Sequence, residues 1–257
     1  MGWKKRALRL AAAILLLFCT GCESAAAVQA PKADRQPAEA AVSSPQSAAP
    51  KAAPAGGKTL PVENIQQRPE FPSGCEITSA AIALNYRGYE VSRETLAGYL
   101  PRSSSFSRSD GRLYGPDPRE TFVGSPDTDR YGCYAPVVVE AVNRFLAGVG
   151  ASENSRAVDL TGTPAERLYG FIDRGLPVIV WVTSGMEAPS PGDEWFLRST
   201  GEYFRWIKKE HVMVLMGYTA GQAVFSDPDD ARGTVSYDRA LFARRYGELS
   251  RQAVVIE

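Results

Sequence analysis

Apolar residues recur at helical spacing over residues 73–84 of the chain. One face of this segment carries apolar residues at positions i, i+3, i+4 and i+7: Ile77, Ala80, Ala81 and Leu84. This spacing predicts an amphipathic helix. Gly88 follows it as a plausible end, because glycine commonly terminates helices.

Four further segments carry helical signals, at residues 92–99, 136–146, 164–174 and 238–246. The third has the clearest start, with Thr163 as the expected N-cap, Pro164 at the first position and Glu166 completing a capping box. Ser92 and Asp238 are residue types that cap helices. We therefore expect a domain with several short helices besides the one at 73–84.

Strands are predicted mainly in the second half of the chain. The apolar or alternating stretches lie at residues 60–65, 176–182, 212–218, 223–226 and 253–256, with a tight turn around Gly221. Residues 101–132 and 183–209 lack a clear period and are expected to be long loops. The second loop carries an aromatic cluster that either lines a groove or packs as a lid: Trp195, Phe196, Tyr203, Phe204 and Trp206. Helices first and strands later predict an α+β fold with an antiparallel sheet.

The N-terminal residues predict export. Lys4, Lys5 and Arg6 precede an apolar run over residues 8–19, as in secretory signals. The run ends at the sequence Cys19-Thr20-Gly21-Cys22, which resembles the bacterial lipobox except that Cys19 stands where leucine is usual. The resemblance implies lipidation of Cys22 and a lipid-anchored protein on the extracytoplasmic side of the cell membrane. A plain secreted protein and an uncleaved anchor are the alternatives.

Three parts of the chain follow from this pattern: a signal peptide at 1–22, a tether at 23–58 and a folded domain at 59–257. The tether is rich in alanine and proline and has no aromatic residue. Such a segment cannot bury enough apolar surface to offset its chain entropy, so we expect it to be disordered.

Composition removes several classes of function. The chain has 257 residues, of which 44% are hydrophobic, and its formal net charge is zero. Zero net charge argues against a nucleic-acid partner, which would require a concentrated basic face. The single histidine excludes a multi-histidine metal site. Asp227, Asp229 and Asp230 lack the glycine and distal glutamate of a calcium loop, so no metal or cofactor is expected.

Cys75 is the candidate nucleophile. It opens the helix predicted at 73–84, and the backbone N–H groups of a helix N-terminus stabilise an anion. A thiol there is expected to have a lowered pKa. The alternative is a buried structural cysteine, the commonest state of a free cysteine. If Glu76, the next residue, lies on the exposed side, it is simply a favourable first-turn acid.

His211 is the only imidazole available as a base. If the turn of the next hairpin is centred near Ala220, His211 and Asp227 become diagonal neighbours on one face of two paired strands. The carboxylate would then fix the imidazole tautomer, and the other ring nitrogen could take the thiol proton. The alternative for Asp227 is a turn residue before Pro228.

Several motifs together resemble the bacteriocin-processing-type cysteine peptidases of the papain-like clan, and more closely their extracellular stand-alone relatives. The motifs lie at residues 68–79, 122–124, 131–136, 175–181, 210–218 and 226–228. The resemblance implies a papain-like fold with Cys75 as nucleophile, His211 as general base and Asp227 as the residue that orients it. It also implies a glutamine as oxyanion donor, for which we favour Gln67 over Gln66.

We therefore expect a membrane-anchored extracellular cysteine peptidase that acts as a monomer on peptide or protein substrates through a thioester intermediate. The alternatives are a cell-wall peptide amidohydrolase and a non-catalytic papain-like binding module. Cys133, the other cysteine of the domain, is expected to be free and buried, although a disulfide with Cys75 is chemically possible.

Overall fold

The computed structural model describes residues 56–257. The predicted signal peptide, the lipidation site Cys22 and almost all of the predicted tether lie outside these residues. Within residues 56–257, no helix has the length and apolar character needed to cross a membrane. The first strand, β1, spans Lys58–Thr59.

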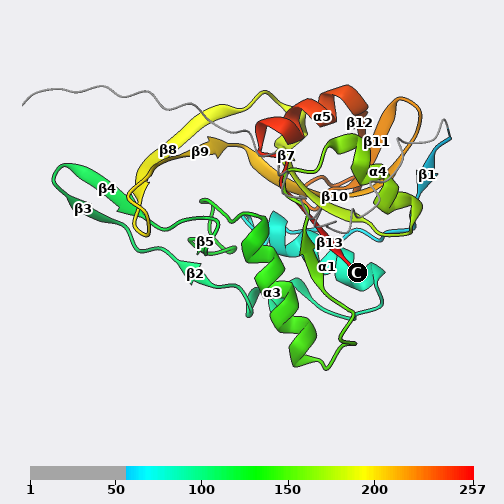
Figure 1. Cartoon of the computed structure of the whole chain (residues 1–257), viewed down its shortest axis with the longest axis horizontal. Helices are drawn as coiled ribbons and strands as arrows, with labels where there is room; N and C mark the ends of the chain where they lie inside the picture. The colour runs from blue at the N-terminus through cyan, green and yellow to red at the C-terminus, as the bar shows by residue number, and fades with distance from the viewer. Residues whose placement is uncertain (1–55) are drawn as a thin grey trace, which may run out of the picture. The chain divides into compact units, whose positions relative to one another are not determined.

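The centre of the domain is a seven-stranded sheet (Figure 1). Its main path runs through β12 (Thr234–Asp238), β11 (Gln222–Ser226), β10 (Glu210–Tyr218), β7 (Val178–Thr183), β13 (Ala253–Ile256) and β6 (Ala157–Asp159). β1 pairs with β10 outside this path, and every pairing in the sheet is antiparallel. All six residues of β7 are buried, so its run of apolar residues marks a strand covered on both faces.

Helices cover the two faces of the sheet (Figure 1). α1 (Cys75–Tyr86) and α3 (Ala135–Gly148) lie on one side, with α2 (Arg93–Ala97) packed against both. α4 (Ala165–Asp173) and α5 (Arg239–Glu248) lie on the other. Residues 75–84 of α1 are all buried, because this helix is enclosed between β10, β7, α2 and α3. The α+β fold predicted from the sequence is confirmed.

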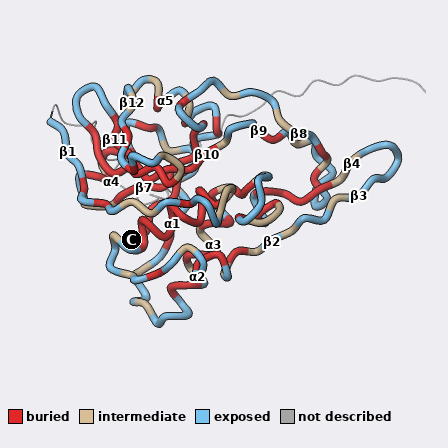
Figure 2. Tube along the Cα trace, turned by 180° about the vertical axis from the view of Figure 1, so that it is seen from behind, coloured by how far each residue is buried: buried red, intermediate tan, exposed pale blue. Residues whose placement is uncertain are grey.

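The two predicted long loops contain a second sheet and a short strand pair. The sheet has four strands: β3 (Ser107–Ser109), β4 (Arg112–Gly115), β8 (Ser190–Leu197) and β9 (Tyr203–Lys208). β2 (Arg102–Ser103) pairs in parallel with β5 (Phe122–Val123). The β3–β4 hairpin projects from the domain and is exposed at its tip (Figures 1 and 2). The loop prediction was wrong here because most positions in these strands are exposed or half-buried, so no apolar period marks them.

The aromatic cluster is the core of this second sheet. Trp195 and Trp206 are buried and pack with Val123 and Leu197. Tyr134 stacks on Trp206 with ring centroids 5.7 Å apart. Of the two expectations for this cluster, packing describes its tryptophans, since both are almost completely enclosed.

Two of the three predicted helix caps are present in the structure, and the third is not. Ser92 accepts a hydrogen bond from the Thr95 N–H, and Asp238 accepts from the first N–H groups of α5. Thr163 does not cap α4: Pro164 is the residue before the helix, and no side chain caps it.

The strand predicted at 60–65 is absent, because pairing stops after Thr59, just ahead of Pro61. α3 begins near Pro136 and α1 ends before Gly88, as predicted.

The β10–β11 hairpin contains a β-bulge at Met216. Near the turn, Tyr218 pairs with Ala223 and Gly217 with Val224, whereas beyond the bulge Leu215 pairs with Phe225. The backbone O of Met216 accepts a hydrogen bond from Leu60 N–H, 2.8 Å away. The segment that continues β1 therefore holds the extra residue in place.

Candidate active site

Cys75 is the first residue of α1. It follows a tight turn in which Gly74 N–H donates to the backbone O of Phe71. A Cβ at residue 74 would overlap the Phe71 side chain, so glycine is the residue that permits this approach. The cysteine is 6% exposed. The predicted position at a helix N-terminus is confirmed, although the sulfur lies deeper than that position alone indicates.

His211 and Asp227 form a buried pair. The Nε2 atom of His211 lies 2.7 Å from Oδ1 of Asp227, and the two residues are 4% and 5% exposed. The same Oδ1 accepts a hydrogen bond from the Asp229 N–H. Burial opposes ionisation of Asp227, but the hydrogen bond and charge of His211 outweigh it, so its pKa lies below the usual value.

The Met216 bulge sets the register that makes this pair possible. Beyond the bulge Val214 pairs with Ser226, so Asp227 lies across from Met213. His211 is two residues from Met213 and therefore shares its face of the sheet. Without the bulge, Asp227 would lie across from Val214 and face away from His211. The diagonal arrangement expected from the sequence is present, but the bulge is one of its causes.

The glutamine candidates occupy different environments. Gln67 is buried, its backbone N–H donates to the backbone O of Pro228, and its Nε2 donates to the backbone O of Pro72. The side chain of Gln66 is exposed and donates to the Asn64 side chain and the Asp230 backbone. The loop holding Gln67 is thus fastened both to the turn before Cys75 and to the residue after Asp227.

Glu76 is not the exposed first-turn acid considered in the sequence. It is completely buried. Its Oε1 accepts the Cys133 N–H at 2.7 Å, and its Oε2 lies 3.3 Å from the Cys75 sulfur. Burial raises the pKa of Glu76 to about 7. The sequence gives no sign of this, because the Cys133 N–H comes from a segment 57 residues further along.

The surroundings of the Cys75 sulfur disfavour its thiolate form. Burial, followed by the charges of Glu76 and Glu210, raises its pKa well above the usual value. The lowered pKa expected from the helix N-terminus is therefore wrong for this state of the site, since desolvation outweighs the helix dipole. Among residues 56–257, no hydrogen bond joins the Cys75 sulfur to His211. The backbone of Val212, the next residue, does contact the sulfur and lowers its pKa.

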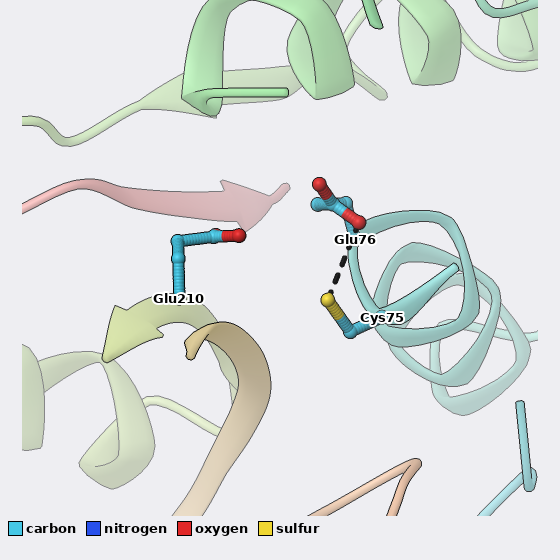
Figure 3. A group of neighbouring side chains, drawn as sticks. All are labelled: Cys75, Glu76 and Glu210. Atoms are coloured by element: carbon cyan, nitrogen blue, oxygen red, sulfur yellow. Dashed lines mark hydrogen bonds between the residues drawn. The ribbon is translucent and has the colours of Figure 1, made fainter. Parts of the chain in front are cut away.

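Glu210 completes an acidic cluster that the sequence analysis missed. Ligand atoms of Cys75, Glu76 and Glu210 all lie within 4.8 Å of one another. In Figure 3 the Glu210 carboxylate points toward the two side chains from α1. Burial and the Glu76 charge raise its pKa well above the usual value. Among residues 56–257, no other cluster of three cysteine, histidine or acidic side chains comes this close together.

Cys133 is a free, buried cysteine, as is Cys75. Its backbone O accepts a hydrogen bond from the Trp181 indole at 2.9 Å. The expectation of a free Cys133 therefore agrees with the structure. The segment around it serves the site through its backbone, since Cys133 N–H fixes the Glu76 carboxylate.

A central helix that begins at a cysteine, packed on an antiparallel sheet that carries a histidine and an acid, defines the papain-like cysteine-peptidase fold. A family model described as "Peptidase_C39 like family" matches residues 59–254. The chain belongs to this family.

Two similar proteins support the assignment. The uncharacterized protein YvpB of Bacillus subtilis (strain 168) is 28% identical over 195 residues, which cover 76% of this chain and 73% of YvpB. A Bacillus anthracis protein, whose crystal structure is described under a provisional C39-like peptidase name, has a TM-score of 0.67 and 28% identity. That match covers 78% of this chain and 97% of the Bacillus anthracis chain.

Proposed function

We propose that this protein is a cysteine peptidase that hydrolyses peptide bonds through Cys75, His211 and Asp227. The buried His211–Asp227 contact is the observation that carries the proposal. The neighbouring ends of β10 and β11 do not need such a pair for stability, because two apolar residues could be buried there without the cost of desolvating charged groups. His211 lies on β10, the strand whose backbone contacts the Cys75 sulfur.

The proposed reaction is acyl transfer. The thiol proton moves from Cys75 to a base beside the sulfur, and the sulfur attacks the substrate carbonyl carbon. Asp227 occupies Nε2 of His211, so Nδ1 is the ring nitrogen that exchanges protons. His211, with a proton on Nδ1, gives that proton to the leaving amine as the C–N bond breaks, and Nδ1 then takes a proton from the water that hydrolyses the thioester and releases the sulfur.

Gln67 is proposed as the oxyanion donor, together with the Cys75 N–H. The Gln67 amide nitrogen carries two hydrogens, and one is used by the backbone O of Pro72. The second remains for the developing oxyanion. One such donor typically contributes about 3 kcal/mol to the transition state.

The test is cleavage of a mixed peptide library by the purified protein, followed by mass spectrometry, with isolated cell-wall fragments run in parallel. Cys75→Ala and His211→Ala are each expected to abolish cleavage while the circular dichroism spectrum stays unchanged. Cys133→Ala is the matched control, a second buried cysteine that is expected to keep activity. Full activity in Cys75→Ala would refute the proposal, and release of wall peptides alone would favour the amidohydrolase.

A non-catalytic binding module is the second candidate, and one observation favours it. The Cys75 sulfur is paired with a carboxylate and its pKa is raised, which is unusual for an activated thiol. An epoxide-type thiol probe separates the two candidates. Fast labelling of Cys75 that is lost in His211→Ala supports an enzyme, whereas labelling at the rate of an ordinary thiol supports a binding module.

The extracytoplasmic location and the lipid anchor at Cys22 are also proposals, and they rest on the signal-like residues 1–22. Labelling of cells with a fatty-acid analogue is expected to tag the protein and to fail for Cys22→Ser. Cys19→Ser is the matched control, because it keeps the second cysteine of the segment. Label that survives Cys22→Ser would contradict the anchor.

A further inference from the structure

Two carboxyl groups flank the candidate nucleophile, and the reaction described above uses neither. Glu76 comes from α1 and Glu210 from β10 (Figure 3). Their carboxylate oxygens and the Cys75 sulfur lie within 4.8 Å of one another. Buried acids are costly unless they are paired or neutral. Their place beside a reactive sulfur therefore needs an explanation in terms of chemistry.

The Glu76 carboxyl is held in one orientation. Its Oε1 accepts the Cys133 N–H at 2.7 Å. Gly132 faces the same oxygen, and a Cβ at that residue would overlap it. With one oxygen fixed by the backbone of residues 132–133, the other oxygen, Oε2, is directed at the Cys75 sulfur, 3.3 Å away.

Glu210 keeps a proton in the cluster. Its Oε1 is enclosed and has no hydrogen-bond partner among residues 56–257. Two carboxylates this close resist ionising together, so the pair holds a proton at a pH where isolated acids have lost theirs. The pKa of Glu76, raised by burial to about 7, and that of Glu210, raised well above its usual value by burial and by the Glu76 charge, agree with this.

We propose that Glu76 is the proton partner of Cys75: its carboxylate takes the thiol proton, and the carboxylic acid so formed donates a hydrogen bond back to the thiolate. The S–H bond breaks, the O–H bond forms at Oε2, and no other reactant is needed. This inference rests on the proposed function, since it assigns a step in activating that nucleophile. His211 and Asp227 then remain to protonate the leaving amine.

Other titratable groups face the cluster and enter the same balance. His211, from β10, acts on Glu76 through its charge. The Cys133 thiol feels both carboxylates. Tyr134 feels Glu210, and burial raises its pKa beyond the range of interest. The wild type and Glu76→Gln share these groups, so a difference between the pH profiles of the two proteins is due to Glu76.

Proton sharing gives Cys75 a distinctive pH profile. When the Cys75–Glu76 pair loses one proton, near pH 7, a fixed small fraction of molecules carries the thiolate and the protonated acid. That fraction stays constant as the pH rises further, because the exchange within the pair releases no proton. We therefore expect thiol reactivity to rise toward about pH 8 and then to level off.

The experiment measures the rate at which iodoacetamide alkylates Cys75 in the purified full chain, from about pH 5 to about pH 9, by mass spectrometry of the Cys75 peptide. In Glu76→Gln the amide oxygen can still accept the Cys133 N–H and the amide nitrogen can donate to the thiolate, but no charge forms. Below pH 7 the variant is expected to match the wild type within about twofold. Near pH 8.5 it is expected to be faster by about tenfold or more, with a single rise and no plateau.

Two further variants complete the test. Glu153→Gln, on an exposed loop, is the control and should follow the wild type. Glu210→Gln replaces a carboxyl that keeps its proton with a neutral amide, so the rise should stay at the wild-type pH. A Glu76→Gln profile that coincides with the wild type would overturn the role of Glu76 as proton partner. A rise that moves to lower pH in Glu210→Gln would show that Glu210 is charged near pH 7 and would overturn its holding of the proton.

Alkylation needs no substrate, so the proposed function and this inference can fail separately. If the protein cleaves no peptide but the alkylation profiles of the wild type and Glu76→Gln differ, the peptidase proposal is refuted and Glu76 stays the proton partner. If the protein cleaves peptides but the two profiles coincide, the peptidase proposal stands and the role of Glu76 is refuted.

Discussion

His211 has two ring nitrogens, and its surroundings give them different tasks. Asp227 occupies Nε2, which leaves Nδ1 for proton exchange. The Asp227 oxygen that receives Nε2 also accepts the Asp229 N–H. Because the Asp229 N–H is a donor, the atom of residue 227 that faces it must be an acceptor, whether a carboxylate or an amide supplies it. Orientation of the imidazole can therefore be tested apart from the negative charge.

Substitution of Asp227 separates these two contributions. Asp227→Asn keeps an oxygen facing the Asp229 N–H, so the amide oxygen still accepts from Nε2, and we expect kcat/KM to fall by only about tenfold. Asp227→Ala removes the acceptor and frees the ring, so a loss of about a hundredfold or more is expected. Peptide-cleavage kinetics provide the measurement.

The control is Asp229→Ala. That side chain pairs with Arg68 on the surface, and the substitution keeps the backbone N–H, so activity should stay within about threefold. Equal losses in Asp227→Asn and Asp227→Ala would show that charge, and not orientation, is what His211 needs.

At this scale the sequence indicates residue types but not their surroundings. The sequence shows that Cys75 follows a glycine, that the chain has a single histidine, and that Asp227 follows it within the length of two strands. The burial of Glu76 is not, because it depends on the backbone at Cys133 meeting its carboxyl. The prediction of a lowered pKa for Cys75 was wrong for a similar reason. The sequence shows the position of Cys75 at the start of a helix, whereas the desolvation that raises its pKa comes from the whole fold.

Among the elements, the β10–β11 hairpin depends on a close approach of β1. Gly217 pairs with Thr59, and a Cβ at residue 217 would lie 2.8 Å from the Lys58 backbone O. Because the obstruction is backbone, it cannot move aside as a flexible side chain would. Gly217 therefore permits the contact that fixes the neighbouring bulge.

Gly217→Ala is expected to lower the free energy of unfolding by about 1–3 kcal/mol and to reduce activity, since β1 would no longer hold the Met216 bulge. Urea denaturation and peptide cleavage provide the measurements. Gly221→Ala is the matched control: a Cβ there has nothing within 4 Å, so stability should change by less than about 0.5 kcal/mol. Equal effects of the two substitutions would contradict the role given to β1.

Elements with a one-sided or fully buried apolar pattern were predictable from the sequence, and the others were not. β7, β10, β11 and β13 lie close to the predicted ranges. β8 and β9 were missed because their outward positions are polar or exposed and their sheet has a small core of its own. The two-residue β1 was predicted too far along the chain, at residues 60–65, because apolar residues there continue beyond the last residue that pairs with β10, Thr59.

On the scale of the whole molecule, the buried acid makes stability depend on pH. The pKa of Glu76 is about 7 in the folded chain, against an ordinary value of 4.5. Between these values the folded state keeps a proton that the unfolded state has lost. Stability from this group is therefore complete below pH 4.5 and is lost as the pH rises to about 7.

The shift corresponds to about 3 kcal/mol. Urea denaturation across this range should show the wild type losing about that much more stability than Glu76→Gln, which has no proton to lose. Glu153→Gln should follow the wild type. A difference between wild type and Glu76→Gln that is constant with pH would contradict a raised pKa for Glu76.

The hydrogen bond from Leu60 to Met216 and the β1 pairing bear on where the domain can be shortened. A protein trimmed to begin at residue 62 would retain every candidate catalytic side chain. It would lack the β1 pairing and the Leu60 hydrogen bond that fix the register of β10 and β11. A protease that nicks the chain just after Leu60 would thus disable the site without touching it.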